Sequence, residues 1–249
     1  MSASHDRMKR TWEESFKTQE ARHAYNTAPV EALVRNVAYY LRSRHPDEKL
    51  GHLEFLEMGC GAGPNLVWLA ERGIGVSGID ISPTALRLAG ENLKRRSLGS
   101  RVRNLMEGSV TQVPLPDASF DGILESCVFQ HLDREDRAKA FAEVRRLLKP
   151  GGIFAGYMLD VGHSIFQKRG SEESKEDPGT LLLNDGSSKI HLSDIGLSHF
   201  FRREEFDRYL EGFAVIDPCL TTYYLPREEG ERRGDPEYLQ SMWAVYAIR

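Results

Sequence analysis

Long apolar runs and an excess of positive charge are both missing from this chain of 249 residues. No stretch approaches the roughly 20 apolar residues that span a bilayer, so we expect no membrane segment. Residues 1–10 are mostly polar and lack the apolar centre of a secretory signal, which predicts a cytoplasmic location. A formal net charge of −4 gives no general attraction to phosphate backbones, so we expect no nucleic-acid partner.

Cysteine is also scarce, and its three copies lie far apart in the sequence, at Cys60, Cys127 and Cys219. Their odd number and wide spacing argue against a disulfide framework, and there is no CxxC pair to indicate a metal site. A divalent-metal site of another kind needs clustered acids, and Glu125 and Asp160 alone do not supply them. We therefore predict reduced thiols and no bound metal.

A glycine-rich turn directly after an apolar strand is the most informative feature that is present. Residues 53–58 predict a buried strand, and Gly59, Gly61 and Gly63 follow on alternate positions before Pro64 opens a helix. Glycine allows positive φ and lets a ligand approach the backbone without meeting a Cβ atom. A strand that ends in such a turn makes a cleft of nucleotide size.

The spacing of these glycines separates the turn from a dinucleotide fingerprint. A pyrophosphate over a helix N-terminus is expected with Gly-x-Gly-x-x-Gly, whereas this chain has Gly-x-Gly-x-Gly. With Glu57 two residues before the first glycine, the turn resembles motif I of the class I S-adenosylmethionine-dependent methyltransferases. The resemblance continues in order through residues 78–82, 114–121 and 147–152. It extends over residues 53–157 and is strongest toward the small-molecule methyltransferases of that superfamily.

Strand and helix signals alternate along the chain. Crossovers of helical length require parallel strands, so the pattern predicts an α/β, doubly wound, mostly parallel sheet of Rossmann-like type. Ser82 and Asp133 are the expected N-caps of two of the helices. The resemblance adds a final hairpin and implies a seven-stranded sheet with an antiparallel last strand. The expected strands are 53–58, 74–80, 101–106, 120–125, 153–159, 213–225 and 242–248.

No shift in composition marks a second domain, so we predict a single domain over residues 1–249, of the methyltransferase type by resemblance. Residues 168–189 are rich in Gly, Ser, Glu and Lys and predict a mobile loop or lid, and the charged run 227–235 predicts a solvated hairpin loop. The expected parts are an N-terminal helical lid (1–50), a cofactor-binding core (51–160), a lid insertion and helix (161–212) and a C-terminal hairpin (213–249).

The resemblance implies S-adenosyl-L-methionine as the cofactor, a ligand with a ribose diol, an adenine, an amino acid and a sulfonium but no phosphate. Asp80 ends the second strand, where a carboxylate can accept from both ribose hydroxyls, with a helix-capping role as the alternative. Ser109 stands where the family usually has an adenine-binding acid. The expected cofactor residues are Glu57, Gly59, Cys60, Gly61, Gly63, Asp80, Ile81, Ser109, Val110 and Glu125.

Methyl transfer needs the acceptor held close to the methyl group, and it needs a base only when the acceptor arrives protonated. His131, after the fourth strand, is the first candidate base, and a structural role at the start of the next helix is equally open. His163 is the second candidate, ahead of His191 and His199. Aromatic walls for a small-molecule acceptor are predicted, with packing as the alternative, at Trp12, Tyr25, Tyr223 and Tyr224.

Two other functions fit parts of the sequence. An NAD(P)-dependent oxidoreductase would share the fold but would need another glycine spacing. A catalytically silent domain that binds the cofactor and serves as the partner of another protein stays open, because an intact pocket cannot be seen in a sequence. Neither the methylated atom of the acceptor (N, O, C or S) nor the choice between monomer and homodimer follows from these residues.

Overall fold

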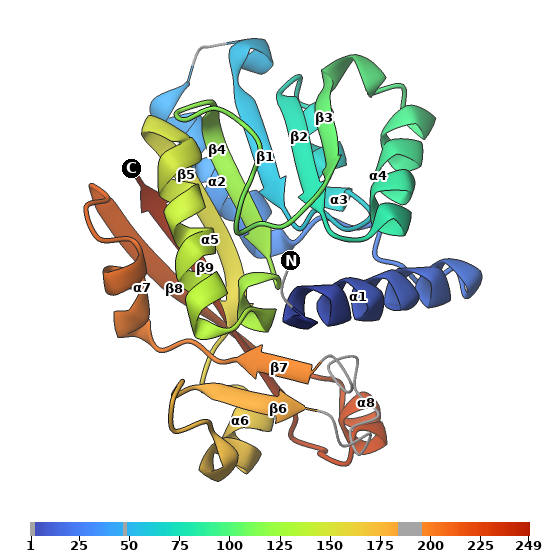
Figure 1. Cartoon of the computed structure of the whole chain (residues 1–249), viewed down its shortest axis with the longest axis vertical. Helices are drawn as coiled ribbons and strands as arrows, with labels where there is room; N and C mark the ends of the chain where they lie inside the picture. The colour runs from blue at the N-terminus through green and yellow to red at the C-terminus, as the bar shows by residue number, and fades with distance from the viewer. Residues whose placement is uncertain (1–2, 47–48, 184–195) are drawn as a thin grey trace.

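A seven-stranded sheet organises the molecule. The computed structural model describes residues 3–46, 49–183 and 196–249, and its strands follow the order β3-β2-β1-β4-β5-β9-β8 (Figure 1). Strands β1 to β5 pair in parallel, whereas β9 runs antiparallel to both β5 and β8. The strands are β1 (Glu54–Met58), β2 (Gly75–Asp80), β3 (Val102–Glu107), β4 (Phe120–Ser126), β5 (Leu148–Leu159), β8 (Val215–Tyr224) and β9 (Leu239–Ile248).

Helices cover both faces of this sheet. On one face, α2 (Glu31–Arg44), α3 (Pro64–Ala70) and α4 (Pro83–Arg95) contribute to an apolar core with Phe55 and Val76 of the strands. On the other face, α5 (Arg134–Leu147) and α7 (Arg203–Tyr209) pack against Leu56 and Phe154. Two separate cores on two faces are what a doubly wound sheet requires. The predicted fold class is therefore confirmed.

The local signals in the sequence explain where most of these elements begin. The Ser82 side chain accepts from the Ala85 N–H and caps α4, and the Asp133 side chain caps α5 in the same way through Asp136. Strand β5 starts five residues before the expected Ile153, because Leu148 already pairs with Phe120 of β4, and the register then shifts before Ile153 pairs with Gly122. Within the described residues there are also four single turns of 3₁₀ helix: η1 (Leu50–His52), η2 (Gly99–Arg101), η3 (Phe129–His131) and η4 (Gly170–Glu172).

The insertion after β5 is more ordered than its composition predicts. Helix α6 (Ser164–Arg169) and a two-stranded antiparallel sheet of β6 (Thr180–Leu183) and β7 (Gly196–His199) enclose a third apolar cluster. The expected loop at 168–189 is therefore wrong for residues 168–172 and 180–183, which form helical turns and a strand, and the expected lid role stays a prediction. Residues 184–195, with His191, lie outside the described residues. Likewise, residues 227–232 form helix α8 (Arg227–Arg232).

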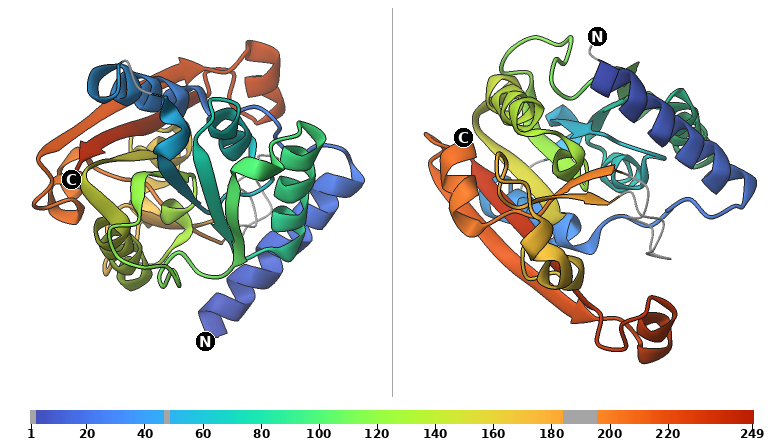
Figure 2. Two further views of the ribbon diagram at one scale, coloured as in Figure 1. Left: turned by 90° about the horizontal axis from the view of Figure 1, so that it is seen from above. Right: turned by 60° about the horizontal axis from the view of Figure 1, so that its bottom comes forward.

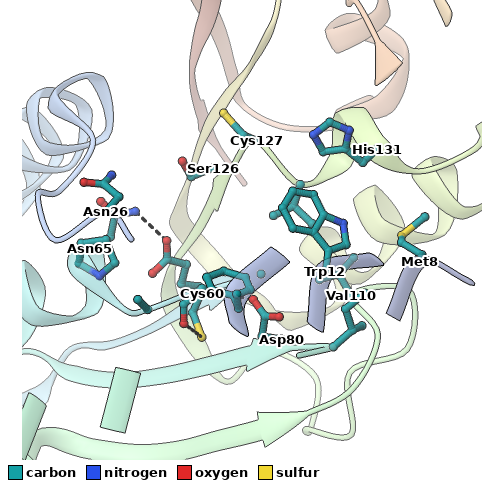
Figure 3. Close-up of a pocket in the computed structure, with 18 of the residues that line it drawn as sticks. Met8, Trp12, Asn26, Cys60, Asn65, Asp80, Val110, Ser126, Cys127 and His131 are labelled. Carbon is teal, nitrogen blue, oxygen red and sulfur yellow. Dashed lines mark hydrogen bonds between the residues drawn. The ribbon is translucent and has the colours of Figure 1, made fainter. Parts of the chain in front are cut away.

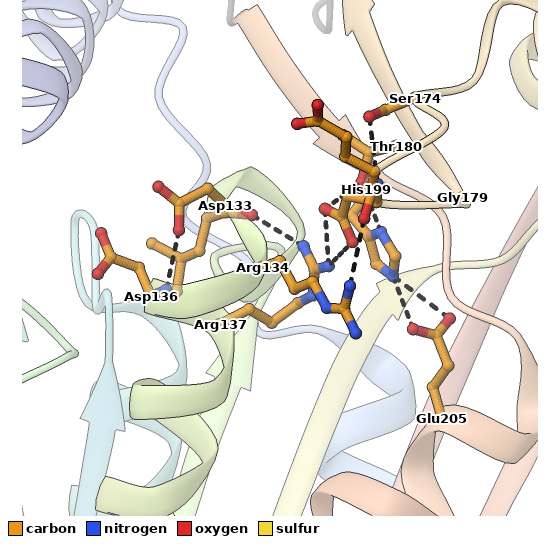
Figure 4. Close-up of polar contacts among 12 residues, drawn as sticks. Asp133, Arg134, Asp136, Arg137, Ser174, Gly179, Thr180, His199 and Glu205 are labelled. Atoms are coloured by element: carbon orange, nitrogen blue, oxygen red, sulfur yellow. Dashed lines mark hydrogen bonds and ion pairs between the residues drawn. The ribbon is translucent and has the colours of Figure 1, made fainter.

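A buried arginine joins this insertion to the core. Arg137 of α5 is 0% exposed, and its guanidinium donates to both oxygens of Asp177 at 2.7 and 2.9 Å and to the carbonyl of Leu132 at 2.9 Å. Asp177 also accepts from the Thr180 hydroxyl, which contacts His199 (Figure 4). Burial acts to raise the pKa of Asp177, but Thr180 and Arg137 outweigh it and hold that pKa below its usual value.

The N-terminal helix lies apart from the two helical layers. Helix α1 (Ala3–Ala21) runs across one edge of the sheet beside α4, as the two further views in Figure 2 show. Residues 22–30 then lead to α2. We refer to residues 3–30 as the N-terminal segment. Among the described helices, none has the length and apolar character needed to cross a membrane.

Candidate functional site

A cavity of about 290 Å³ lies at the carboxyl ends of β1, β2 and β4. The strand order reverses between β1 and β4, and open α/β sheets bind their ligands at such a switch point. The glycine turn forms its floor, and the N-terminal segment closes the opposite side with Met8, Trp12 and Phe16. Figure 3 shows Trp12 in this space, with His131 on one side and Val110 on the other.

The glycine turn is fixed by its backbone conformation and by its neighbours. Gly59, Gly61 and Gly63 have φ of 77°, 52° and 78°, in the left-handed region that favours glycine. A Cβ atom on Gly59 would lie 2.3 Å from a methyl carbon of Val128. The N–H groups of Gly59 and Cys60 both donate to the carbonyl of Ile79, at 2.8 and 3.1 Å. These bonds hold the turn against the end of β2.

Asp80 connects the glycine turn to the start of α4. Its Oδ2 accepts from the Gly61 N–H at 2.8 Å, and its Oδ1 accepts from the Ser82 N–H at 2.9 Å. Burial raises the pKa of Asp80, although these two N–H groups act in the opposite direction. A carboxylate offers about four acceptor positions, so these two bonds leave room for a further donor from a ligand. The capping role and the ligand role are therefore compatible.

Glu57 is the second acid of the cavity wall, and one of its oxygens has no partner. Its Oε1 accepts from the Asn65 side chain at 2.6 Å, whereas Oε2 is buried without a hydrogen bond in the described part of the chain. Burial raises the pKa of Glu57 to about 8, despite the bond from Asn65. A buried acceptor without a donor is costly, so this oxygen indicates a place for a ligand donor.

Ile81, Ser109 and Val110 line the cavity beyond Asp80. The Ser109 hydroxyl is already bonded to the Thr111 hydroxyl at 2.8 Å and accepts from the Thr111 N–H at 3.2 Å. Ser109 therefore shapes the turn after β3, and the side chains of Ile81 and Val110 offer apolar surface to a flat ring.

The turn after β4 contributes Ser126, Cys127 and Val128 to the wall. Cys127 has a φ of 59°, which is rare for a residue with a side chain, and burial raises the pKa of its thiol to about 12. Glu125 does not line the cavity as expected, because its Oε1 turns inward and accepts from the N–H groups of Val128 and Phe129 at 2.5 and 3.0 Å. Burial raises its pKa to about 7.

His131 lines the cavity, and both of its ring nitrogens are paired within the protein. The Gln130 amide is oriented by the Leu159 N–H, which donates to Oε1, so its Nε2 donates to His131 Nε2 at 3.3 Å. The opposite nitrogen, Nδ1, donates to the carbonyl of Leu197 at 3.2 Å. Burial lowers the pKa of His131 to about 4, so the ring is neutral at pH 7. This arrangement favours the structural role over the role of a base.

Glu13 holds α1 at the site. No pattern in the sequence indicated this role. Its Oε2 accepts from the Ser82 hydroxyl at 2.7 Å and the Thr84 N–H at 3.1 Å, and its Oε1 accepts from the Thr84 hydroxyl at 2.7 Å. Glu13 therefore adds a carboxylate to the N-terminus of α4, where anions are stabilised. The same helix carries Trp12, whose ring centroid lies 5.5 Å from that of His131.

Four other expected residues lie elsewhere. His163 caps α6 by accepting from the Ile165 N–H at 3.2 Å and packs against Tyr238, and burial lowers its pKa to about 4. Tyr223 and Tyr224 lie on the edge strand β8, where Tyr224 is 68% exposed, so their expected place in the acceptor wall is corrected. Tyr25 is also absent from the wall, which its neighbour Asn26 lines instead.

Two further observations limit the chemistry of the site. Among the described residues, no group of three His, Cys, Asp or Glu side chains is placed to hold a metal ion. His199 bonds to Thr180 and Glu205 within the insertion and does not line the cavity. The fold and the cavity define the class of the protein: a Rossmann-like α/β protein with a ligand site at the carboxyl edge of its sheet.

Comparison with known proteins narrows this class. Residues 56–156 match the family model described as a methyltransferase domain. An uncharacterised methyltransferase of Geobacillus sp. (strain WCH70) is 35% identical over 153 residues, which are 61% of this chain and 68% of that protein. Sterol 24-C-methyltransferase ERG6B of Gibberella zeae is 26% identical over 225 residues, 89% of this chain and 56% of that protein.

A solved structure agrees in fold. The 1,6-didemethyltoxoflavin-N1-methyltransferase of Burkholderia thailandensis, solved with S-adenosylhomocysteine bound, superimposes with a TM-score of 0.62 at 17% identity, over 100% of this chain and 91% of that one. The chain belongs to the methyltransferase domain family, within the class I S-adenosylmethionine-dependent methyltransferase superfamily. It spans only 42% to 66% of the length of the first three curated relatives that it matches.

Proposed function

We propose that this protein transfers a methyl group from S-adenosylmethionine to a small-molecule acceptor. The observation that carries the proposal is the polar composition of the cavity. The described residues that line it include three acidic side chains, those of Glu57, Asp80 and Asp136, and no lysine or arginine. Pro64 also removes an N–H group from the start of α3, where a pyrophosphate would need donors. A ligand with hydroxyl and ammonium donors fits such a wall better than a dinucleotide.

The residues present fit S-adenosylmethionine group by group. Asp80 would accept from the ribose hydroxyls through its two remaining acceptor positions, and Glu57 would accept from the ammonium group through its unpaired Oε2. Ile81 and Val110 would pack on the adenine, and the glycine turn leaves its backbone accessible. When bound, this cofactor would supply an activated methyl group on its sulfonium sulfur. The acceptor atom would take the methyl group by in-line displacement, with S-adenosylhomocysteine as the leaving group.

The acceptor wall consists of Trp12, Cys127, His131 and Leu132. These side chains exclude water and hold the acceptor close to the methyl group. This proximity contributes to the rate of transfer. Because His131 is neutral with both nitrogens paired, it contributes shape and a fixed loop. The relatives named as sterol and toxoflavin-type methyltransferases support a small-molecule acceptor.

Calorimetry with S-adenosylhomocysteine and with NAD tests the cofactor. We expect micromolar or tighter binding of S-adenosylhomocysteine and no detectable heat with NAD, and the reverse result would overturn the proposal in favour of an oxidoreductase. The transfer itself is tested by incubating the protein with radiolabelled S-adenosylmethionine and a panel of small acceptors. Tight cofactor binding with no labelled product across the panel would instead support the catalytically silent domain.

A further inference from the structure

Asn65 holds a fixed position between two parts of the cavity wall. It is the second residue of α3 and is 3% exposed, and Glu57, which it contacts, is 2% exposed. Its Oδ1 accepts from the Val30 N–H at 2.9 Å, and its Nδ2 donates to Glu57 Oε1 at 2.6 Å. A backbone N–H can only donate, so the Val30 contact determines which way the amide is turned.

This orientation has a consequence for Glu57. Because Nδ2 must face the carboxyl group, Oε1 is occupied and Oε2 becomes the oxygen without a partner. Both Glu57 and Asn65 line the cavity. A buried acceptor without a donor, such as Glu57 Oε2, is costly and stays in place only if other contacts hold the side chain. Here the short hydrogen bond from Asn65 to Oε1 holds the carboxyl group.

We propose that Asn65 is a positioning residue that makes the cavity selective for ligands with a primary ammonium group. Its amide holds the Glu57 carboxyl group in one orientation and leaves Oε2 as the free acceptor for that cation. The inference rests on the proposed function, because the ammonium group in question is that of the amino-acid end of S-adenosylmethionine. Asn65 itself does not touch the ammonium group and acts through Glu57.

The simpler role for Asn65 is to hold the start of α2, since Val30 is the N-cap residue of that helix and no side chain caps it locally. The two roles predict different results. Loss of a purely structural residue weakens every ligand of the cavity alike. Loss of a positioning residue weakens only the ligands that carry the ammonium group.

Two nucleoside ligands separate these roles. S-adenosylhomocysteine carries both the ammonium and the carboxylate, whereas 5′-S-(3-carboxypropyl)-5′-thioadenosine lacks only the ammonium. We would measure both dissociation constants by calorimetry at about pH 8.5, above the Glu57 pKa of about 8, for the full chain, for Asn65→Leu and for Asn36→Leu. Asn36 is a matched control, because its amide donates to the carbonyl of Val245 at 3.1 Å and does not line the cavity.

In Asn65→Leu we expect the affinity for S-adenosylhomocysteine to fall about tenfold or more, with the deamino ligand changed less than about twofold. In Asn36→Leu the ratio of the two dissociation constants should stay at the wild-type value. Equal losses for both ligands in Asn65→Leu, or no loss for either, would overturn the proposal. If the wild-type chain binds neither ligand, the proposed function itself has failed, which is a distinguishable result.

The pH dependence of the ratio of the two dissociation constants also separates the two roles, because a purely structural role of Asn65 would leave it unchanged. Glu57 pairs with a cation only when ionised, and the neighbouring acids Asp80 and Glu125 both act to keep it protonated, so the preference for the ammonium ligand should increase as the pH rises through about 6 to 8.5. Asn65 donates to the carboxylate, so in Asn65→Leu this increase should shift to higher pH. Should Asn65→Leu not fold, Glu57→Gln supplies the second test. It keeps a carbonyl for Asn65 and removes the charge, and an unchanged ratio of the two dissociation constants in that variant would overturn the proposal.

Discussion

Replacing Glu13 with glutamine should loosen the attachment of α1 to the cavity. In the folded protein the Glu13 carboxylate accepts from the hydroxyls of Ser82 and Thr84 and from the Thr84 N–H. Burial acts to raise the pKa of Glu13, but these donors outweigh it and lower the pKa to about 2. The neutral amide of glutamine presents an N–H₂ group to at least one of these donors, so part of the contact is lost.

The size of the effect follows from the pKa. The folded value lies below the value of 4.5 for a free glutamate, so the carboxylate stabilises the folded state above about pH 4.5, and this contribution is lost as the pH falls toward 2. The difference corresponds to an upper limit of about 3 kcal/mol at neutral pH. Because the side chain keeps 17% of its exposure, solvent reduces this figure, and we expect about 1–2 kcal/mol.

Hydrogen exchange of the α1 amides measures this loss directly. A change of about 1–2 kcal/mol corresponds to about a 5- to 30-fold larger open population of α1. Glu14→Gln is the matched control, since Glu14 is the next residue of the same helix and is exposed. If α1 must move for S-adenosylhomocysteine to leave, its dissociation rate should rise by the same factor. Equal exchange rates in the two variants would refute the reasoning.

Three further predictions concern the acids and the histidine of the site. Asp80→Ala should weaken binding of S-adenosylhomocysteine by about 1–3 kcal/mol in calorimetry, because the ribose hydroxyls lose their acceptor, and an unchanged affinity would contradict this role. Burial lowers the pKa of His131 from 6.5, the value for a free histidine, to about 4. The neutral ring therefore stabilises the folded state above pH 6.5, and this stabilisation is lost as the pH falls toward 4. Its ring protons should therefore show no titration by NMR between about pH 8 and 5.5, and a midpoint near the free value would show that the ring is accessible. For Glu125, burial raises the pKa from 4.5 to about 7, so its protonated form favours the folded state and this stability is lost as the pH rises through that range. In urea denaturation, the free energy of unfolding of Glu125→Gln should therefore increase relative to that of the wild type by on the order of 2 kcal/mol between about pH 5.5 and 8.5. A difference that stays constant over this range would count against a buried, protonated Glu125.

The sheet and the glycine turn could be predicted from the sequence, because each depends on residues that are neighbours in the chain. The run from Phe55 to Met58 is buried, Gly59 needs a positive φ, and Ser82 caps the helix that follows β2. Asp80 lies in the cavity wall for the same reason, since the end of a parallel strand sets its position. Such features need only a few neighbouring residues, and the sequence shows them directly.

Contacts between distant segments could not be predicted in the same way. Glu13 reaches Ser82 across 69 positions, and nothing near Glu13 distinguishes it from Glu14. Glu125 lies near the end of the buried strand β4, and whether its side chain faces the cavity or the N–H groups of Val128 and Phe129 depends on the path of the next turn. The exposure of Tyr224 depends on β8 being the edge strand, which is a property of the whole sheet.

The burial of Arg137 decides which part of the molecule can open. Moving the described part of the insertion away from α5 would separate its guanidinium from Asp177 and leave a buried charge without its counter-ion, at a cost of about 3–5 kcal/mol. Helix α1 is held at the cavity in part by Glu13, whose side chain is 17% exposed and whose contacts we expect to contribute about 1–2 kcal/mol. Cofactor and product should therefore pass on the side of α1, while the described part of the insertion stays packed on α5. Its described residues do not line the cavity, but the Leu197 carbonyl holds His131 of the acceptor wall through Nδ1, so substitutions there can change the acceptor wall without loosening α1.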